Sequence, residues 1–455
     1  MEIGAGAGSA MPGPTRTSWL DAVVVALNET CDGKRWYTST KELQLASLEF
    51  CMVCRNYNTV HLKVDAQTPR RLLAAADAPP PYPKRLCSTR VPRLRARCVT
   101  WNIPTAEILT TPIFAMKGAN CLEFGRAFEG SVEAVAWPQQ LKRVEFHYAS
   151  PFNQPIDLVQ WPAMLQRLLL GGKFNRPIEG VAWPDSLQTL ELGMFLNQAI
   201  EQVSWPDSLQ EVIFGDFFNQ PIERVSWPES LQLLHFGEDF NQPIERVVWP
   251  ASLKRVTFYI DSRFNQRIAD VAWPASIQQL YFGQHLNQPI QRVVWPPSLQ
   301  QVIFVGDFNH PIEGVFWPNS LQRLDFGNGF NQPIDNVRWP PSLQELSFGW
   351  SEVRGYKGMA MFSDFDQRIG TSVWPASLRR LTLGDKFRQS LHGLGNWMPN
   401  LEAFRLLHHG SGGDSLLRGV EWPKGLRELT VFEESSLDGV VIPSTVEVHR
   451  PVLEL

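Results

Sequence analysis

The sequence predicts a repeat solenoid built mainly of β-strands, and two observations lead to this prediction. Twelve of the 17 tryptophans occur in Trp-Pro pairs, and seven of the eleven intervals between successive pairs are 22 residues. A fixed period of this length is typical of units that stack on one another. Within a unit, apolar residues alternate as in a short strand, and the frequent prolines exclude a long helix. We therefore expect each unit to form one coil with one short strand.

The composition of the 455 residues suits a chain with a large packed core. Apolar residues make up 44%, charged residues 19%, and the net charge is −4. This balance argues against a disordered polyelectrolyte and against a dedicated nucleic-acid binder. The longest apolar run, residues 22–27, is too short for a membrane span or a secretory signal. We expect a cytoplasmic, monomeric protein without nucleic-acid or membrane partners.

Three segments precede the repeats. Residues 1–17 are rich in Gly, Ala, Ser and Pro, which predicts a disordered tail. Residues 18–66 combine a helix-like run with strand-like alternation and are expected to form a small helical cap, because the first coil would otherwise expose its apolar end. Residues 67–115 are rich in Pro and Arg and are expected to be a linker that enters the solenoid. Its basic stretch is either a solvated linker or a contact strip for an acidic partner.

All six cysteines lie within the first 121 residues, and the spacing of Cys51 and Cys54 raises the question of a metal site. No second CxxC pair follows, and no helix is indicated after this one, as a redox motif would require. Disulfides would need an oxidising compartment. We expect reduced thiols, no metal and no cofactor.

The repeat unit is clearest between residues 209 and 250. The run Leu209-Gln-Glu-Val-Ile-Phe214 is followed by Phe218-Asn-Gln-Pro-Ile222 and by Trp227-Pro-Glu-Ser-Leu231, where the next unit begins. The opening of the unit resembles a leucine-rich repeat, and its Phe-Asn-x-Pro-Ile signature resembles the FNIP repeat. The resemblance implies right-handed coils with a parallel sheet on the concave face. We expect about 13 coils over residues 116–447, followed by a tail at 448–455.

The recurring asparagine is expected to bury its amide and to satisfy backbone groups of neighbouring coils, because an amide can both donate and accept. The Trp-Pro pair is expected to anchor the core. A row of exposed tryptophans that binds sugars is the alternative. The asparagine ladder comprises Asn153, Asn175, Asn197, Asn219, Asn241, Asn265, Asn287, Asn309 and Asn331.

The candidate recognition residues lie where the repeat leaves the residue type free. Two positions of each strand point away from the core, and several of them carry apolar side chains. Insertions directly after the strands, including residues 350–362, add aromatic residues and arginine, which are common at interface hot spots. The predicted partner-binding residues are Leu169, Ile213, Leu233, His235, Tyr281, Ile303, Tyr148, Tyr259, Trp350, Arg354 and Tyr356.

No catalytic motif accompanies these features, since the chain lacks P-loop, G-x-S-x-G and H-E-x-x-H patterns. The sequence therefore predicts a non-enzymatic scaffold that binds a protein partner through the concave face and the 350–362 loop. Relatives of this repeat class are often joined to an F-box, so the resemblance implies a ubiquitin-ligase substrate receptor as an alternative. A carbohydrate-binding solenoid is a third hypothesis.

Overall fold

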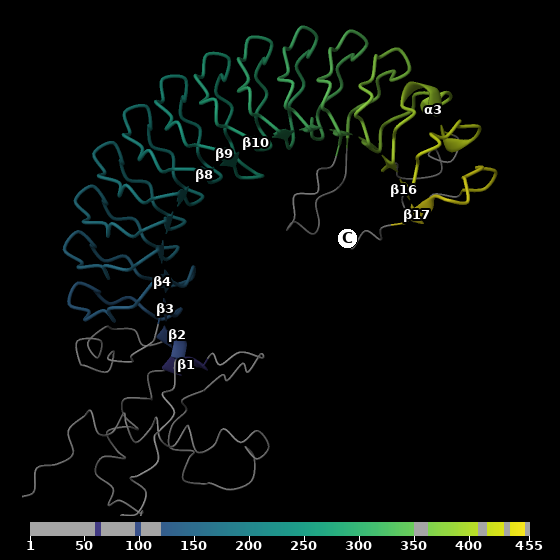
Figure 1. The fold of residues 1–455 in the computed structure, drawn as a ribbon. Helices are drawn as coiled ribbons and strands as arrows, with labels where there is room; N and C mark the ends of the chain where they lie inside the picture. Colours follow the sequence, from purple (N-terminus) through teal and green to yellow (C-terminus); the bar gives the residue numbers. More distant parts are fainter. Residues whose placement is uncertain are drawn as a thin grey trace, which may run out of the picture. The chain divides into compact units, whose positions relative to one another are not determined.

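The chain forms stacks of short parallel strands connected by turns (Figure 1). The computed structural model describes residues 120–349, 363–407, 416–431 and 437–450, together with the backbone of two strands at 60–64 and 96–101. The chain divides into two compact units, residues 1–174 and residues 175–455. Among the described residues, no helix is long and apolar enough to cross a membrane.

The described residues of the first unit form five strands, and the four successive pairs among them are parallel. They are β1 (Val60–Val64), β2 (Ala96–Trp101), β3 (Cys121–Phe124), β4 (Arg143–Phe146) and β5 (Arg167–Leu169). Strand β2 lies inside the segment predicted to be a linker, and β1 lies inside the predicted cap. The described parallel ladder therefore includes strands that precede residue 116. The predicted cap helix and the Cys51/Cys54 pair lie outside the described residues.

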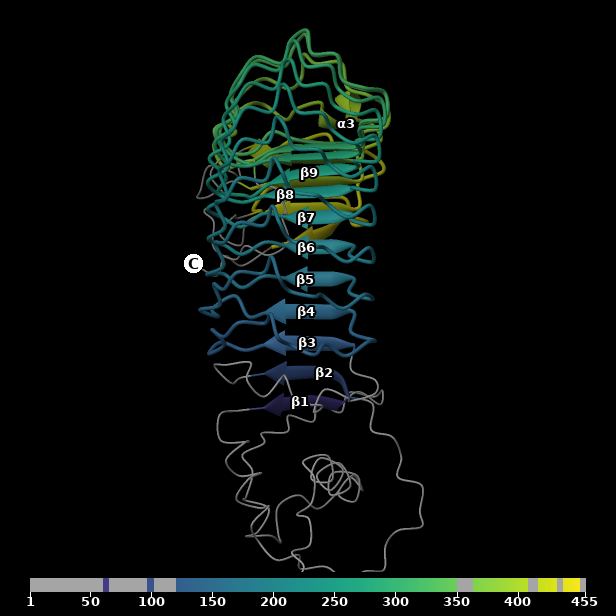
Figure 2. The ribbon, with the colours of Figure 1, turned by 90° about the vertical axis from the view of Figure 1, so that its left-hand side faces the viewer.

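The second unit continues the same design, with each strand pairing in parallel with the next, as Figure 2 shows for the stacked arrows. A four-residue helix, α3 (Leu394–Trp397), replaces a turn late in the unit. The strands lie on the inner side of this curved unit, and the turns lie on its outer side (Figure 1). The strands are β6 (Thr189–Glu191), β7 (Glu211–Ile213), β8 (Leu233–Phe236), β9 (Arg255–Phe258), β10 (Gln279–Phe282), β11 (Gln301–Phe304), β12 (Arg323–Asp325), β13 (Glu345–Phe348), β14 (Arg380–Leu383), β15 (Ala403–Leu406), β16 (Glu428–Val431) and β17 (Glu447–His449).

The coil of β7 closes through three four-residue turns after its strand. In the coil of β7, backbone hydrogen bonds run from Phe218 N to the oxygen of Gly215 (3.2 Å), from Val225 N to Ile222 (3.2 Å) and from Leu231 N to Pro228 (3.0 Å). The proline of the Trp-Pro pair opens the third turn and contributes only its carbonyl, so its missing N–H costs nothing there. The Trp-Pro-x-Ser-Leu sequence thus returns the chain to the next strand.

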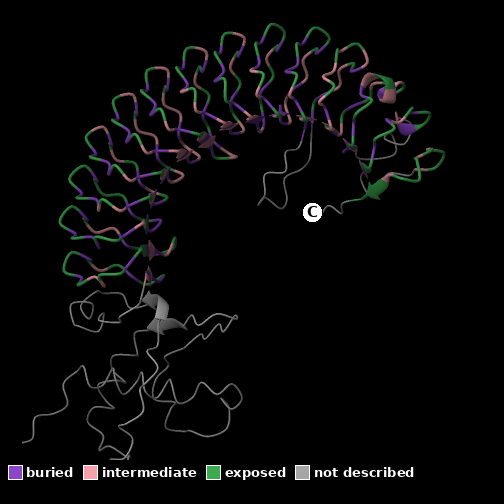
Figure 3. Ribbon diagram, in the orientation of Figure 1, coloured by how far each residue is buried: buried purple, intermediate pink, exposed green. Residues whose placement is uncertain are grey.

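Columns of aromatic side chains fill the interior of the stack. Figure 3 marks the buried residues on the ribbon of the described coils. The rings of Phe214 and Phe236 in successive coils stack with centroids 5.5 Å apart, and those of Trp205 and Trp227 lie 5.9 Å apart. The tryptophans of the regular coils, for example Trp249 at 7% exposure, are buried. They therefore act as core anchors, and they offer no exposed platform on which a sugar could stack.

Three coils carry an insertion directly after the strand, and each of them uses a buried serine to rejoin the stack. In the 35-residue coil, the hydroxyl of Ser363 donates to the oxygen of Phe348 (2.9 Å) and accepts from Phe365 N (3.4 Å). The hydroxyl of Ser150 does the same between Phe128 O and Phe152 N. Each of these serines stands two residues before a phenylalanine. This Ser-x-Phe pattern, which includes Ser262, occurs only in the coils with an insertion after the strand.

The asparagines of the repeat connect each coil to the next. The Oδ1 atom of Asn219 accepts hydrogen bonds from Asn241 N (3.0 Å) and from Gln242 Nε2 (3.0 Å) in the following coil. Where the repeat carries Asp366 instead, its carboxylate accepts the equivalent pair of bonds from the next coil. The asparagines are half-buried or exposed rather than buried as predicted. The asparagines that accept a bond from the next coil in this way are Asn175, Asn197, Asn219, Asn241, Asn265, Asn287, Asn309 and Asn331.

A second ladder is formed by the serine of the Trp-Pro-x-Ser-Leu sequence. The hydroxyl of Ser230, at the end of a unit, donates to the backbone oxygen of Leu209 at the start of the same unit, at 2.6 Å. The sequence analysis did not identify this ladder, although the serine recurs at a fixed place. The serines that donate in this way are Ser208, Ser230, Ser252, Ser276, Ser320, Ser342 and Ser377.

We expect Asn241→Ala to lower the free energy of unfolding by roughly 1–3 kcal/mol, because Asn265 N–H loses its acceptor and the Gln266 amide keeps only the backbone oxygen of residue 241. Urea unfolding followed by tryptophan fluorescence measures the change. Asn241→Asp is the matched control, since Asp366 fills the same role in the native chain, and it should retain more stability than the alanine variant. An unchanged urea midpoint for Asn241→Ala would show that the ladder does not stabilise the stack.

Candidate functional site

The inner face of the sheet in the second unit presents two parallel rows of side chains. Alternate residues of each strand point away from the core, and the strands pair in register, so equivalent positions line up across the coils. The first row contains Glu211, Leu233 and Arg255, and the second contains Ile213 and His235 as direct neighbours. These two rows are the candidate partner-binding surface.

Strands β7 to β11 form the more apolar half of this face. In the second row, Ile213 pairs with His235, Thr257 follows on β9, and Tyr281 pairs with Ile303. Five of the predicted partner-binding residues, including Leu233 in the first row, therefore lie together on neighbouring strands.

One of these residues is less accessible than the sequence predicted. Ile303 is only 2% exposed, whereas Tyr281 remains half-buried. The reason is that the Tyr281 hydroxyl donates to Gln301 Oε1 at 2.7 Å, which draws the phenol across β11 beside Ile303. Asp325, which is itself buried, pairs with Ile303 from the other side. The apolar surface at this point is therefore presented by Tyr281.

A histidine–carboxylate pair lies at the centre of the apolar half. His235 Nε2 is 3.5 Å from Glu211 Oε1, and Glu211 also accepts from the Thr189 hydroxyl at 3.3 Å. Burial lowers the pKa of His235, and this effect outweighs the opposing attraction of Glu211. Arg255 on β9 adds to the lowering. The imidazole is thus held preferentially in its neutral form.

The remaining predicted residues lie elsewhere. Leu169 is half-buried on β5 in the first unit, where Tyr148 is 68% exposed directly after β4. Tyr259 directly follows β9 of the second unit and is 36% exposed. The three residues predicted in the long insertion lie outside the described residues, namely Trp350, Arg354 and Tyr356.

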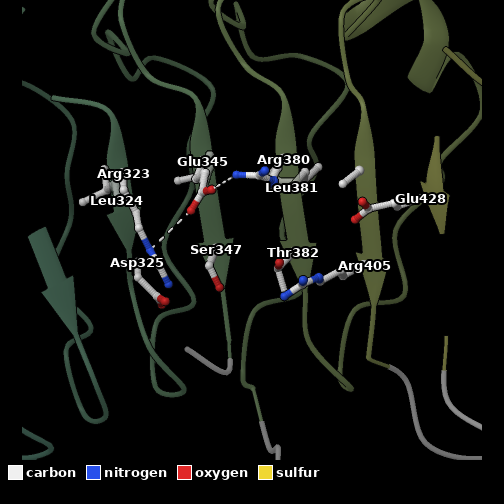
Figure 4. A pocket seen from close by; sticks show the side chains of 12 residues that line it. Arg323, Leu324, Asp325, Glu345, Ser347, Arg380, Leu381, Thr382, Arg405 and Glu428 are labelled. Atoms are coloured by element: carbon white, nitrogen blue, oxygen red, sulfur yellow. Dashed lines mark hydrogen bonds and ion pairs between the residues drawn. The ribbon is translucent and has the colours of Figure 1, made fainter. Parts of the chain in front are cut away.

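The other half of the inner face, from β12 to β16, is hollowed into a polar pocket of about 270 Å³ (Figure 4). The pocket forms because Ser347, Thr382 and Ala403 are small, whereas the strands on either side carry long charged residues. Its volume is close to the lower limit of small-molecule pockets, so it suits one or two side chains of a partner rather than a large cofactor.

Charges of both signs line this pocket. Glu345 lies between Arg323 (3.5 Å) and Arg380 and forms ion pairs with both, as the dashed lines in Figure 4 show. On the opposite side, Arg405 extends toward Thr382 (Figure 4). At the end of β12, the buried Asp325 accepts a hydrogen bond from Gly327 N at 3.0 Å. The pocket therefore offers both donors and acceptors.

The part of this pocket formed by Arg380 and Thr382 was not predicted from the sequence, because the 35-residue coil interrupts the 22-residue spacing. The signal was nevertheless present. Trp374-Pro-Ala-Ser-Leu378 restarts the repeat, so Arg380 and Thr382 occupy the positions equivalent to Glu345 and Ser347. Counting forward from each Trp-Pro pair would have placed them on the inner face.

Within the described part of the chain, no group of three or more His, Cys, Asp and Glu side chains is arranged to hold a metal ion. The chemistry of both halves of the face is that of a binding surface, with apolar side chains, hydroxyl groups and paired charges.

The sequence model of the FNIP Repeat family matches this chain six times. The matches cover residues 152–195, 174–217, 195–232, 218–259, 264–307 and 308–351. The chain therefore carries FNIP repeats, which confirms the resemblance inferred from the Phe-Asn-x-Pro-Ile signature. No curated protein matches the sequence.

Two solved structures resemble the fold. CroV588, described as a novel circular LRR protein, is 30% identical with a TM-score of 0.58, and the similarity covers 77% of this chain and 56% of that chain. A chain of the Toll–Spatzle complex of Drosophila is 13% identical with a TM-score of 0.56, covering 83% of this chain and 51% of that one. The chain thus spans about half the length of each. Together they establish a leucine-rich-repeat-like solenoid.

We expect the environment of His235 to make stability depend on pH. Because burial lowers its folded-state pKa, the unfolded state binds a proton more readily once the pH falls below the ordinary histidine value of 6.5. Acidification from about pH 7.5 to about pH 5.5 should therefore lower the urea midpoint more in the native chain than in His235→Gln. Equal losses in the two proteins would show that His235 is not held in its neutral form.

Proposed function

We propose that this FNIP-repeat chain is a non-enzymatic scaffold that binds a protein partner through the inner face of its sheet. The observation that carries the proposal is the division of that face into an apolar half and a polar pocket. A protein interface needs an apolar centre together with polar groups that fix orientation. Both lie side by side on one continuous sheet, on strands β7 to β16.

The apolar half would supply the binding energy. Ile213, Leu233 and Tyr281 are half-buried at positions where the repeat requires no apolar residue, since other coils carry charged or small polar residues there. Tyrosine is favoured at hot spots because its ring is large and loses little conformational freedom. The internal hydrogen bond of Tyr281 to Gln301 holds the ring in place before a partner arrives.

The polar pocket would supply specificity. The ion pairs of Glu345 with Arg323 and Arg380 fix three long side chains at the edge of the pocket and reduce the ordering needed on binding. A partner side chain that enters can exchange hydrogen bonds with the hydroxyls of Ser347 and Thr382. A partner group that leaves these groups unpaired would be disfavoured.

We extend the proposal to the insertion at 350–362, since Trp350, Arg354 and Tyr356 are residue types common in interface centres. Deletion of this segment should weaken partner binding if it contributes. A substrate-receptor role in a ubiquitin ligase would in addition require an adaptor-binding segment within residues 1–115. Recovery of a ligase adaptor with that segment alone would extend the function in that direction.

We expect Tyr281→Ala to weaken partner binding by roughly tenfold or more, because it removes the largest accessible side chain of the apolar half. Quantitative affinity capture with the full chain as bait compares the proteins retained by the native and variant chains. Leu233→Ser should show a loss of the same proteins.

The matched control is Val294→Ser, because Val294 is 78% exposed but precedes the buried Trp295 on a turn, away from the strands. Proteins that bind through the inner face should be retained by this variant. Capture that is unaffected by Tyr281→Ala and Leu233→Ser, or reduced equally by Val294→Ser, would contradict the proposed site.

A further inference from the structure

A group of apolar and acidic side chains follows strands β6, β7 and β8. It lies at the carboxyl ends of these strands rather than on the inner face of the sheet. We name this group the edge patch. It consists of Met194, Phe195, Phe217, Asp216, Glu238 and Asp239.

The centre of the edge patch is a stacked pair of phenylalanines. The rings of Phe195 and Phe217 lie 4.7 Å apart at an angle of 15°, and Phe217 remains 42% exposed. Met194 beside them is 38% exposed. The solenoid does not require an aromatic residue here, since the next coils carry Asp239 and Arg263 at the equivalent position. The pair is therefore apolar surface that the fold itself does not use.

The backbone holds the edge patch in a fixed arrangement. Phe217 N donates to Met194 O at 3.0 Å, and Asp239 N donates to Asp216 O at 2.7 Å, so successive coils step in register. The coils approach so closely that a Cβ atom on Gly215 would lie 2.3 Å from the oxygen of Gly193. A side chain there is excluded, and the patch is ordered before any partner binds.

The acidic half of the edge patch has an excess of negative charge. Arg263 contacts Asp239 at 2.7 Å and Glu238 at 3.5 Å. Together with Asp216, these three carboxylates and one guanidinium carry a net charge of −2. The pKa of Asp216 is raised, first by burial and then by repulsion from Asp239. A cation brought close by a partner would relieve this repulsion.

We propose that the edge patch is a docking site for a protein segment that places an apolar or aromatic side chain next to a lysine or arginine. The apolar side chain covers Phe217 and Met194, and the cation lies over Asp216 and Asp239. An arginine can also contact the exposed ring of Phe217, because cations are attracted to aromatic faces within about 6 Å. The site is separate from the inner-face rows and does not depend on the function proposed for them.

The test uses a phage-displayed library of random linear dodecapeptides, selected on the immobilised full chain. The enriched peptides should share an apolar or aromatic residue beside Lys or Arg. Synthetic copies should bind the native chain, and Phe217→Ser should weaken them by roughly tenfold or more. The double variant Asp216→Asn and Asp239→Asn should weaken them by roughly three- to tenfold, and the affinity of the native chain should fall with added salt.

Two controls make the result decisive. Phe316→Ser removes a phenylalanine that is 79% exposed on a turn before Trp317, and Tyr281→Ala alters the inner face; both should leave peptide binding unchanged. Equal urea midpoints for Phe217→Ser and the native chain verify that the fold is retained. Failure to enrich peptides, peptides without basic residues, or a loss with Phe316→Ser as large as that with Phe217→Ser would overturn the proposal. Loss only with Tyr281→Ala would assign the peptides to the inner face instead.

Discussion

The structure depends on one constraint, which is that each coil buries its apolar residues only against the coils on either side of it. A single coil of about 22 residues cannot form a core alone. The aromatic columns, with stacked pairs such as Phe214 and Phe236, therefore form only when equivalent residues of neighbouring coils lie directly beside one another. Asn219 accepts a hydrogen bond from the next coil, and Ser230 donates one to Leu209 at the start of its own unit, so two sets of bonds fix how successive coils align. Residues that serve the register cannot vary freely, and the sequence repeats them.

Function is consequently confined to positions that the register leaves free. These are the outward-pointing residues of the strands and the residues directly after them. On the inner face this freedom is used for an apolar half that includes Tyr281 and for the pocket around Glu345. At the edge it is used for the stacked pair Phe195 and Phe217. The same rigidity that restricts the core prepares these surfaces, because side chains on a fixed ladder lose little freedom when a partner binds.

The repeat period, the strand in each coil and the burial of the tryptophans could be predicted from the sequence, since they follow from the spacing of apolar residues. What could not be predicted depends on contacts between coils. The burial of Ile303 results from the tilt of Tyr281 toward Gln301, which no single repeat encodes. The asparagine side chains were predicted to be buried, yet they are half-buried or exposed, because a repeated residue indicates a structural role but not its depth in the fold. Arg380 was missed because a longer coil hides the period.

The most direct test of this account is amide hydrogen exchange on the native full chain. The backbone N–H groups of Asn219 and Asn241 lie near solvent but donate to the side-chain oxygens of the preceding coil at 3.0 Å. If inter-coil bonds hold the stack together, these amides should exchange as slowly as those of Val212 and Leu234 in the neighbouring strands, since all would open only when coils separate. Exchange of the asparagine amides at the rate of an unstructured peptide, with the strands still protected, would contradict the central role of the ladder.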